Sequence, residues 1–236
     1  MTGCQAARGR ASVGPPRESP VMGSPMNATS LPESLLLFAL HDERGTVHPS
    51  AFIAIDHGLR AAALAELRLQ GFLQTKRDGQ ARRHPEAPDR PASPMLAEAW
   101  TTLADQPPGS TEAWVKALAA LPDLRMRLAR GLADRGVLRA EGRLRTMLPE
   151  QLTFPLNDAS VEAELVEGLR RALTLGERVS PRDGTLIGLT VACHLEPWVF
   201  GERVDEAVAL ARWVTDRDAI VRALVAVVQQ AETWGG

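Results

Sequence analysis

The stretch that decides the fold reads SLPESLLLFALHDERG and covers residues 30–45. Ser30 can cap a helix and Glu33 completes a capping box, while the proline between them is tolerated in a first helical turn. An apolar helix is predicted next over Leu35–Leu40, and the sequence Asp42–Gly45 is typical of a turn. We therefore expect the ordered part of the chain to begin at Ser30 with an apolar helix.

The residues before this stretch have a different composition. Residues 1–29 are rich in Pro, Gly, Ser and Arg, and segments of this kind do not bury enough apolar surface to fold. We predict a disordered tail over 1–29 and one helical domain over 30–236. No apolar stretch of secretion-signal type occurs near the start, and no run of about 18 apolar residues predicts a transmembrane helix. Any membrane contact is therefore expected to be peripheral.

Capping residues, glycines and prolines indicate a series of further helices. Residues 76–94, with four Pro and five Lys or Arg, are predicted as a mobile surface loop. Short apolar runs at Val137–Ala140 and Leu144–Leu148 flank Glu141-Gly142 and predict a small projecting β-hairpin. The fold class is therefore mostly α. The expected helices run over about 56–70, 94–103, 111–120, 122–136, 158–175, 181–195, 202–213 and from a cap at 215–218 to 233.

The overall charge and the cysteines restrict the classes of function. The chain has 27 Lys and Arg against 29 Asp and Glu, a formal net charge of −2, so an anionic partner must be held by a local patch. Cys4 and Cys193 do not form a disulfide framework, which fits a reducing cytoplasm.

The sequence contains none of the common catalytic motifs. The chain has no G-x-S-x-G, no phosphate-binding loop, no G-x-G-x-x-G and no H-E-x-x-H, and its five histidines lack metal-ligand spacing. The acidic pair Asp216 and Asp218 fits helix capping better than catalysis. We therefore predict a protein that is not an enzyme and that has no metal and no cofactor.

Arg60 and Arg125 each fall in the first turn of a predicted helix, one after Asp56 and the other after Pro122. A cation there faces the positive end of the helix dipole, which costs up to about 1 kcal/mol. Free N–H groups at a helix start bind anions, and a guanidinium strengthens such a site. Two such sites suggest one shared phosphate pocket. The alternative, which the pattern leaves open, is two exposed arginines paired with Asp56 and Asp123.

Basic residues are concentrated over 123–145, where seven arginines accompany three acidic residues. Leu144, Met147 and Leu148 add apolar bulk on or beside the predicted hairpin. A basic surface with a projecting apolar loop is typical of a protein that docks on an anionic membrane. A winged helix offers the same helix-then-hairpin order to DNA, and a solvated helix with a surface hairpin fits the pattern too. The arginines are Arg125, Arg127, Arg130, Arg135, Arg139, Arg143 and Arg145.

Four stretches agree in order and spacing with one known family. They are Leu35–Gly45, Gly58–Leu73, Arg125–Leu138 and Phe154–Leu156. The first resembles the opening apolar helix and acidic turn of the Golgi phosphoprotein 3 family, whose members bind phosphatidylinositol-4-phosphate. The second resembles the next helix and its exit, the third the central helix before the hairpin, and the fourth the return after it. The resemblance spans residues 30–230, nearly the whole ordered chain.

The resemblance implies a mostly helical domain with a projecting hairpin and a headgroup pocket built from a Trp and several Arg. Arg60 and Arg125 fall on pocket positions, and we group Arg127 with them as a headgroup-binding residue. Pro122 stands where the Golgi members have another pocket Arg, and the stretch aligned with the pocket Trp reads Pro49–Phe52. A generic anionic phosphate surface therefore follows more directly than selectivity for one phosphoinositide.

The hairpin is the expected membrane element, although it is less apolar than the membrane-inserting hairpin of the family. Its residues Arg143, Leu144, Met147 and Leu148 are expected to contact the membrane or a second copy of the chain in a homo-oligomer.

We therefore expect a cytoplasmic, peripherally membrane-associated protein that binds an anionic, phosphoinositide-like phospholipid. One alternative is a winged-helix-like module that binds nucleic acid through residues 122–150, and another is a structural interaction protein with no anion site. The helices that follow the hairpin favour the membrane protein, because a winged-helix module would not need them packed in the same domain. Nucleic acid is therefore not the expected partner.

Overall fold

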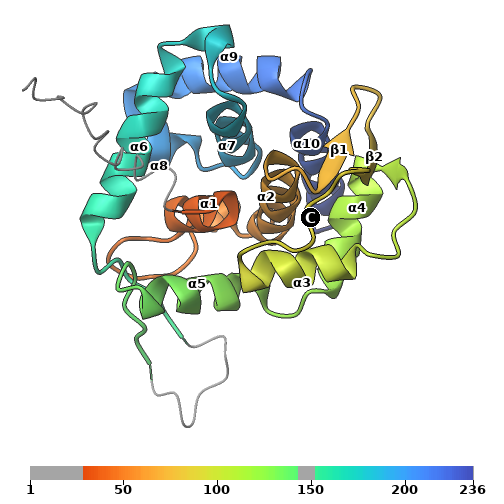
Figure 1. Ribbon diagram of the computed structural model, residues 1–236. Helices are drawn as coiled ribbons and strands as arrows, with labels where there is room; N and C mark the ends of the chain where they lie inside the picture. The colour runs from red at the N-terminus through yellow and green to blue at the C-terminus, as the bar shows by residue number, and fades with distance from the viewer. Residues whose placement is uncertain (1–28, 143–151, 236) are drawn as a thin grey trace, which may run out of the picture.

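The computed structural model describes residues 29–142 and 152–235. Helices α1 (Leu31–Ala39) and α2 (Ile55–Leu69) lie in the middle of the molecule, and the other helices lie around them (Figure 1). The prediction of a mostly α fold is confirmed. The surrounding helices are α3 (Pro94–Thr102), α4 (Thr111–Ala117), α5 (Leu124–Asp134), α6 (Ala159–Leu173), α7 (Pro181–Ala192), α8 (Glu196–Phe200), α9 (Val204–Thr215) and α10 (Ala219–Gly235).

Helix α1 is mostly apolar, and all of its residues except Glu33 are buried. Its leucines at 31, 35, 36 and 37 are at most 1% exposed, as expected for a helix without a polar face. The backbone N–H of Ser30 donates to Glu33 Oε2 at 2.8 Å, so the predicted capping box is confirmed. The sequence at residues 30–45 therefore places a central helix with a defined start.

Helix α2 is rich in alanine, and its small side chains let other helices approach closely. The alanines at 61, 62, 63 and 65 are fully buried, and α2 packs against α1, α4, α7 and α10. At Gly58 a Cβ atom would lie 2.4 Å from the buried Sγ of Cys193. Glycine is therefore needed here for close packing, two residues before Arg60.

Most expected helix starts are capped as the sequence predicts. Ser110 and Ser180 accept backbone N–H bonds at 3.1 Å, and Asp158 does so at 3.0 Å. Asp218 accepts from the N–H of Ile220 at 2.9 Å, and its carboxylate also takes two hydrogen bonds from Arg68 of α2. The capping interpretation of Asp218 is confirmed.

A small antiparallel sheet corrects one prediction. Strands β1 (Leu73–Thr75), β2 (Gln80–Arg83) and β3 (Gly109–Ser110) pair in that order. The prediction of a loop over residues 76–94 is therefore wrong for β2. Residues 76–79 form the turn between β1 and β2, with Gly79 at a φ of +86°. Asp78-Gly79 is a strong hairpin signal, but only Ala81 of β2 is buried, so the strand lacks an apolar pattern.

The predicted β-hairpin has its strand pairing in a different place. Leu138 pairs with Leu156 and Glu141 pairs with Thr153, so the described return segment is 153–156 and the turn at Glu141-Gly142 is not a tight hairpin turn. The predicted second strand at 144–148 lies outside the described residues. The return segment is fixed to the turn after α1, because Gly45, with a φ of +61°, lies so close that a Cβ atom would be 2.1 Å from the Pro155 nitrogen.

Candidate functional site

The start of helix α5 leaves its first backbone N–H groups without a side-chain cap. Asp123 occupies the N-cap position with a left-handed backbone, at a φ of +48°, and its side chain accepts no capping hydrogen bond. Asp is one of the few non-glycine residues that adopt this conformation, and a left-handed residue cannot continue a right-handed helix. The helix therefore begins at Leu124, two residues after Pro122, and Arg125 lies in its first turn as predicted.

Arg60 has a different position in its helix from the one predicted. Helix α2 begins at Ile55, so Arg60 is its sixth residue and lies in the second turn. The prediction that Arg60 faces the helix dipole from the first turn is therefore wrong, because the dipole field is concentrated in the terminal turn. The side chain nevertheless reaches the cavity at the start of α5.

Arg60 and Arg125 line one cavity of about 220 Å³, which we call the α5 N-terminal cavity. One arginine comes from the second turn of α2 and the other from the first turn of α5, so the fold brings together residues that are far apart in the chain. This juxtaposition is the one that the sequence suggests as a shared pocket. The complete lining is Asp56, Arg60, Leu121, Asp123, Leu124, Arg125 and Met126.

The two guanidinium groups of this cavity are weakly paired. Arg125 Nε lies 3.7 Å from Asp56 Oδ1, with 40% and 49% of the two side chains exposed, and an exposed ion pair at this distance contributes little. Within residues 29–142 and 152–235, no carboxylate lies within 4.0 Å of the Arg60 side-chain nitrogens. The alternative interpretation, in which Asp56 pairs with an arginine, therefore applies to Arg125, although the contact is long.

The pKa of His57 depends on the charge of the neighbouring Arg60. Burial lowers the pKa of His57, the cationic Arg60 and Lys116 lower it further, and Asp56 opposes them. The imidazole is therefore mostly neutral at pH 7, next to a guanidinium that keeps its charge. A phosphate bound near Arg60 would favour the protonated form of this histidine.

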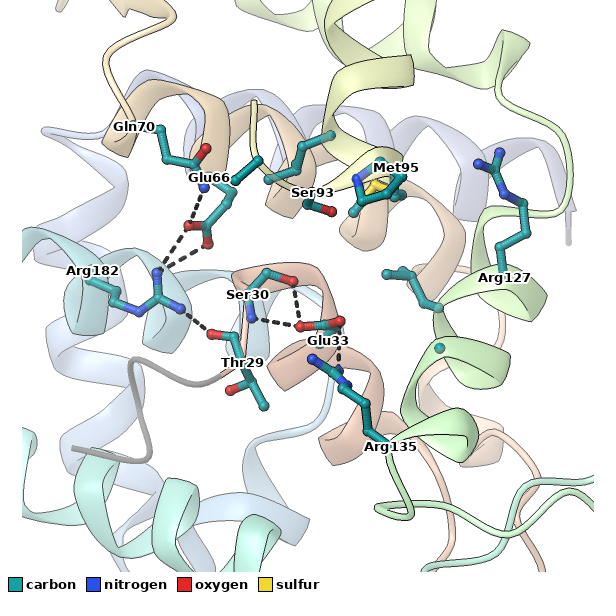
Figure 2. A pocket seen from close by; sticks show the side chains of 15 residues that line it. Thr29, Ser30, Glu33, Glu66, Gln70, Ser93, Met95, Arg127, Arg135 and Arg182 are labelled. Atoms are coloured by element: carbon teal, nitrogen blue, oxygen red, sulfur yellow. Dashed lines mark hydrogen bonds and ion pairs between the residues drawn. The ribbon is translucent and has the colours of Figure 1, made fainter. Parts of the chain in front are cut away.

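Arg127 lies in a different place from Arg125. Successive residues of an α-helix are about 100° apart, so two positions give about 200°, and the two side chains leave α5 on opposite sides. Arg127 forms an ion pair with Glu98 of α3. It also lines a second, larger cavity of about 710 Å³, which we call the Glu66 cleft (Figure 2). The structure therefore brings Arg60 and Arg125 together and leaves Arg127 apart from them.

The Glu66 cleft contains arginines that already have carboxylate partners. Arg182 Nη1 lies 3.0 Å from Glu66 Oε2, and Arg135 Nη2 lies 2.7 Å from Glu33 Oε1 (Figure 2). Glu66 is 6% exposed and also accepts the backbone N–H of Leu31 at 2.7 Å. The arginines of this cleft neutralise buried or partly exposed carboxylates of the protein itself, so little of their charge is left for an anionic ligand.

The basic region 123–145 is divided in the folded chain. Arg127, Arg135 and Arg139 form ion pairs with Glu98, Glu33 and Glu141 respectively. Of the predicted membrane or homo-oligomer residues, Arg143, Leu144, Met147 and Leu148 all lie outside the described residues. Their contacts stay a prediction.

The described part of the chain contains neither a membrane-spanning helix nor a metal-binding cluster. No helix there is both long enough and apolar enough to cross a bilayer. No cluster of three or more His, Cys, Asp or Glu side chains in the described ranges could hold a metal ion.

The chain matches a protein-family model over most of its length. The model of the family described as Golgi phosphoprotein 3 (GPP34) matches residues 31–231, which is most of the chain. The chain therefore belongs to the Golgi phosphoprotein 3 family, and the resemblance identified from the sequence is confirmed.

Proposed function

We propose that this member of the Golgi phosphoprotein 3 family is a non-enzymatic, peripheral membrane protein that binds anionic phospholipid headgroups in the α5 N-terminal cavity. One observation carries the proposal. Arg60 and Arg125, from two separate helices, line the same cavity at a helix start without a side-chain cap. Family membership supports a phosphatidylinositol-4-phosphate-like ligand.

The chemistry of the cavity suits a phosphate monoester. Its oxygens accept hydrogen bonds from guanidinium groups, which are always charged and can bind in a bidentate manner. The free N–H groups at the start of α5 add donors of the kind that bind phosphate at helix N-termini. Each charge-assisted contact contributes about 1.5–3 kcal/mol, which is enough to hold a headgroup when two or three such contacts act together.

Two carboxylates in the same cavity oppose an anion, and they shape what can bind. Asp56 lies 3.7 Å from Arg125, so a phosphate must displace this contact. The loss is small because both side chains are well exposed. Binding should therefore weaken as salt rises, since exposed charges are screened within about 10 Å at 0.1 M salt.

The residues at the two other pocket positions implied by the family favour a general phosphate site over a site for one phosphoinositide. Pro122 is exposed and carries no charge, although the Golgi members have another arginine at this position. Ala51, in the stretch aligned with the pocket Trp, is fully buried. With neither group available, the phosphate of the headgroup is recognised more strongly than the inositol ring to which it is attached.

The experiment is co-sedimentation with vesicles of phosphatidylcholine alone or with added phosphatidylserine or phosphatidylinositol-4-phosphate, at about 0.1 M salt. We expect binding to the two anionic compositions, strongest with the phosphomonoester, and loss of most of it in the double variant Arg60→Gln, Arg125→Gln. A mobility shift with duplex DNA at the same salt tests the winged-helix alternative. DNA binding without vesicle binding, or a double variant that binds vesicles like the parent, would overturn the proposal.

A further inference from the structure

A pair of apolar side chains is exposed directly before helix α2. Phe52 is 67% exposed and Ile53 is 48% exposed, although neighbouring residues of the same segment are fully buried. Single exposed hydrophobic residues are common on protein surfaces. Two consecutive large hydrophobic side chains are less common, and these two lie on the segment that leads into α2 and Arg60.

The backbone that carries the pair is held firmly. Ala51, Ala54 and Ile55 are fully buried on either side of it, and the N–H of Ala54 donates to the carbonyl of Ala51 at 3.0 Å. The short helix η2 (Pro49–Ala51) precedes the pair, and α2 begins immediately after it. The two side chains are therefore presented by a rigid turn and are not part of a loose loop.

The pair lies beside the proposed headgroup site. Phe52 lines a cavity of about 240 Å³ together with Arg125 and Met126, and the same two α5 residues line the α5 N-terminal cavity with Arg60. An exposed ring and two lightly paired guanidiniums thus share one stretch of surface. A membrane surface is complementary to this arrangement, because its anionic headgroup phosphates lie directly beside its apolar acyl layer.

We infer that Phe52 and Ile53 insert into the headgroup and acyl boundary of an anionic membrane while Arg60 and Arg125 hold its phosphates. The inference rests on the proposed function and adds the membrane-contacting residues to it. A lipid surface fits the pair because Arg125 is next to it, whereas an apolar site for a protein partner would not need a cation there.

The first test compares the double variant Phe52→Ser, Ile53→Ser with the parent and with Leu175→Ser. Leu175 is 47% exposed and lies outside both cavities, so it controls for the loss of an exposed leucine-sized side chain. On vesicles that contain phosphatidylinositol-4-phosphate, we expect the double variant to bind about tenfold more weakly or worse. Leu175→Ser should bind like the parent, and Phe52→Leu should keep most of the affinity.

The second test places a fluorescent reporter at the pair. Phe52→Cys and Leu175→Cys are labelled with an environment-sensitive dye in a chain that carries Cys4→Ser. Burial raises the pKa of the Cys193 thiol to about 12, which keeps it protonated and unreactive toward the dye. Vesicles should shift the emission at position 52 to the blue, with quenching by lipids that carry a shallow quencher. The emission at position 175 should not change.

The outcomes separate this inference from the proposed function. If the parent binds anionic vesicles but the serine double variant binds equally well, the inference is overturned and the headgroup site stands. If the parent binds no vesicles, both fail. If the parent sediments as a dimer that the serine variant converts to a monomer, with no change in vesicle binding, a second copy of the chain covers the pair and the inference fails. Thermal melting checks that each variant is folded.

Discussion

Helix α5 has arginines on two opposite sides, and the two sides differ in what faces them. On the side of the Glu66 cleft, Arg127 forms an ion pair with Glu98, and Arg135 at the end of α5 lies 2.7 Å from Glu33 Oε1. In the α5 N-terminal cavity, the nearest carboxylate to Arg125 is 3.7 Å away and both partners are well exposed. The number of arginines is therefore a poor guide to an anion site. What distinguishes the two cavities is how much of the positive charge is already neutralised.

The largest effect is expected on the structural side of this comparison. Arg182→Met removes the main cation from Glu66, whose side chain is 8% exposed. Loss of one partner from a buried pair costs about 3–5 kcal/mol, and we expect about 2–3 kcal/mol because Arg182 itself is partly exposed. Urea unfolding measures the change. Vesicle binding by the folded variant should equal that of the parent, and a variant as stable as the parent would contradict the structural role.

The next effect is expected on the binding side. Arg60→Gln should weaken binding to anionic vesicles by about tenfold, which corresponds to about 1.4 kcal/mol. Its unfolding midpoint in urea should stay close to that of the parent, because no described carboxylate lies within 4.0 Å of the side chain. A clear loss of stability with unchanged vesicle binding would show that Arg60 stabilises the fold and does not bind the headgroup.

A smaller effect of opposite sign is expected at Asp56. Asp56→Asn removes the carboxylate that competes with a bound phosphate for Arg125. An exposed pair of this kind contributes about 0.2–1 kcal/mol, so vesicle affinity should rise by up to about fivefold. Vesicle titrations beside Asp105→Asn, a similar charge change outside the cavity, give the comparison. If Asp56→Asn weakens binding, Asp56 positions Arg125 for the ligand.

The smallest effect concerns the titration of His57. Because the folded-state pKa of His57 is lowered, the unfolded chain binds more protons below the ordinary value of about 6.5. The titration of His57 therefore lowers the free energy of unfolding as pH falls through that value toward the folded-state pKa. Arg60→Gln should raise the pKa of His57 and reduce this pH dependence. Nuclear magnetic resonance titration of the imidazole protons measures the shift, and a lower pKa in the variant would contradict the arrangement.

Local signals in the sequence predicted much of the fold. These signals involve residues only a few positions apart in the chain, so they can be recognised without knowledge of the fold. They are the capping box at Ser30 and Glu33, the N-caps Ser180 and Asp158, and the apolar run of α1. Strand β2 was missed because only Ala81 of it is buried, although Asp78-Gly79 before it is a hairpin signal.

The candidate site was predicted less completely, for two physical reasons. Grouping Arg127 with Arg125 conflicts with helical periodicity, which puts the two on opposite sides of α5. The pairing of Arg127 with Glu98 and of Arg182 with Glu66 depends on contacts between distant parts of the chain, and no local pattern reveals such partners. Arg60 and Arg125 line one cavity, in agreement with the pairing that the sequence suggests. The helix-dipole argument fails for Arg60 because this residue is fifth from Asp56 and sixth from Ile55, which places it in the second turn with either helix start.

The most direct test of the central claim compares Arg125→Gln with Arg127→Gln. The two changes remove the same charge from residues two positions apart on one helix, with 40% and 34% of the side chains exposed. Titration with vesicles containing phosphatidylinositol-4-phosphate should give a Kd about tenfold weaker for Arg125→Gln and within about twofold of the parent for Arg127→Gln. Equal weakening in both variants would mean that only net charge matters. A larger loss for Arg127→Gln would contradict the assignment of the site to the α5 N-terminal cavity.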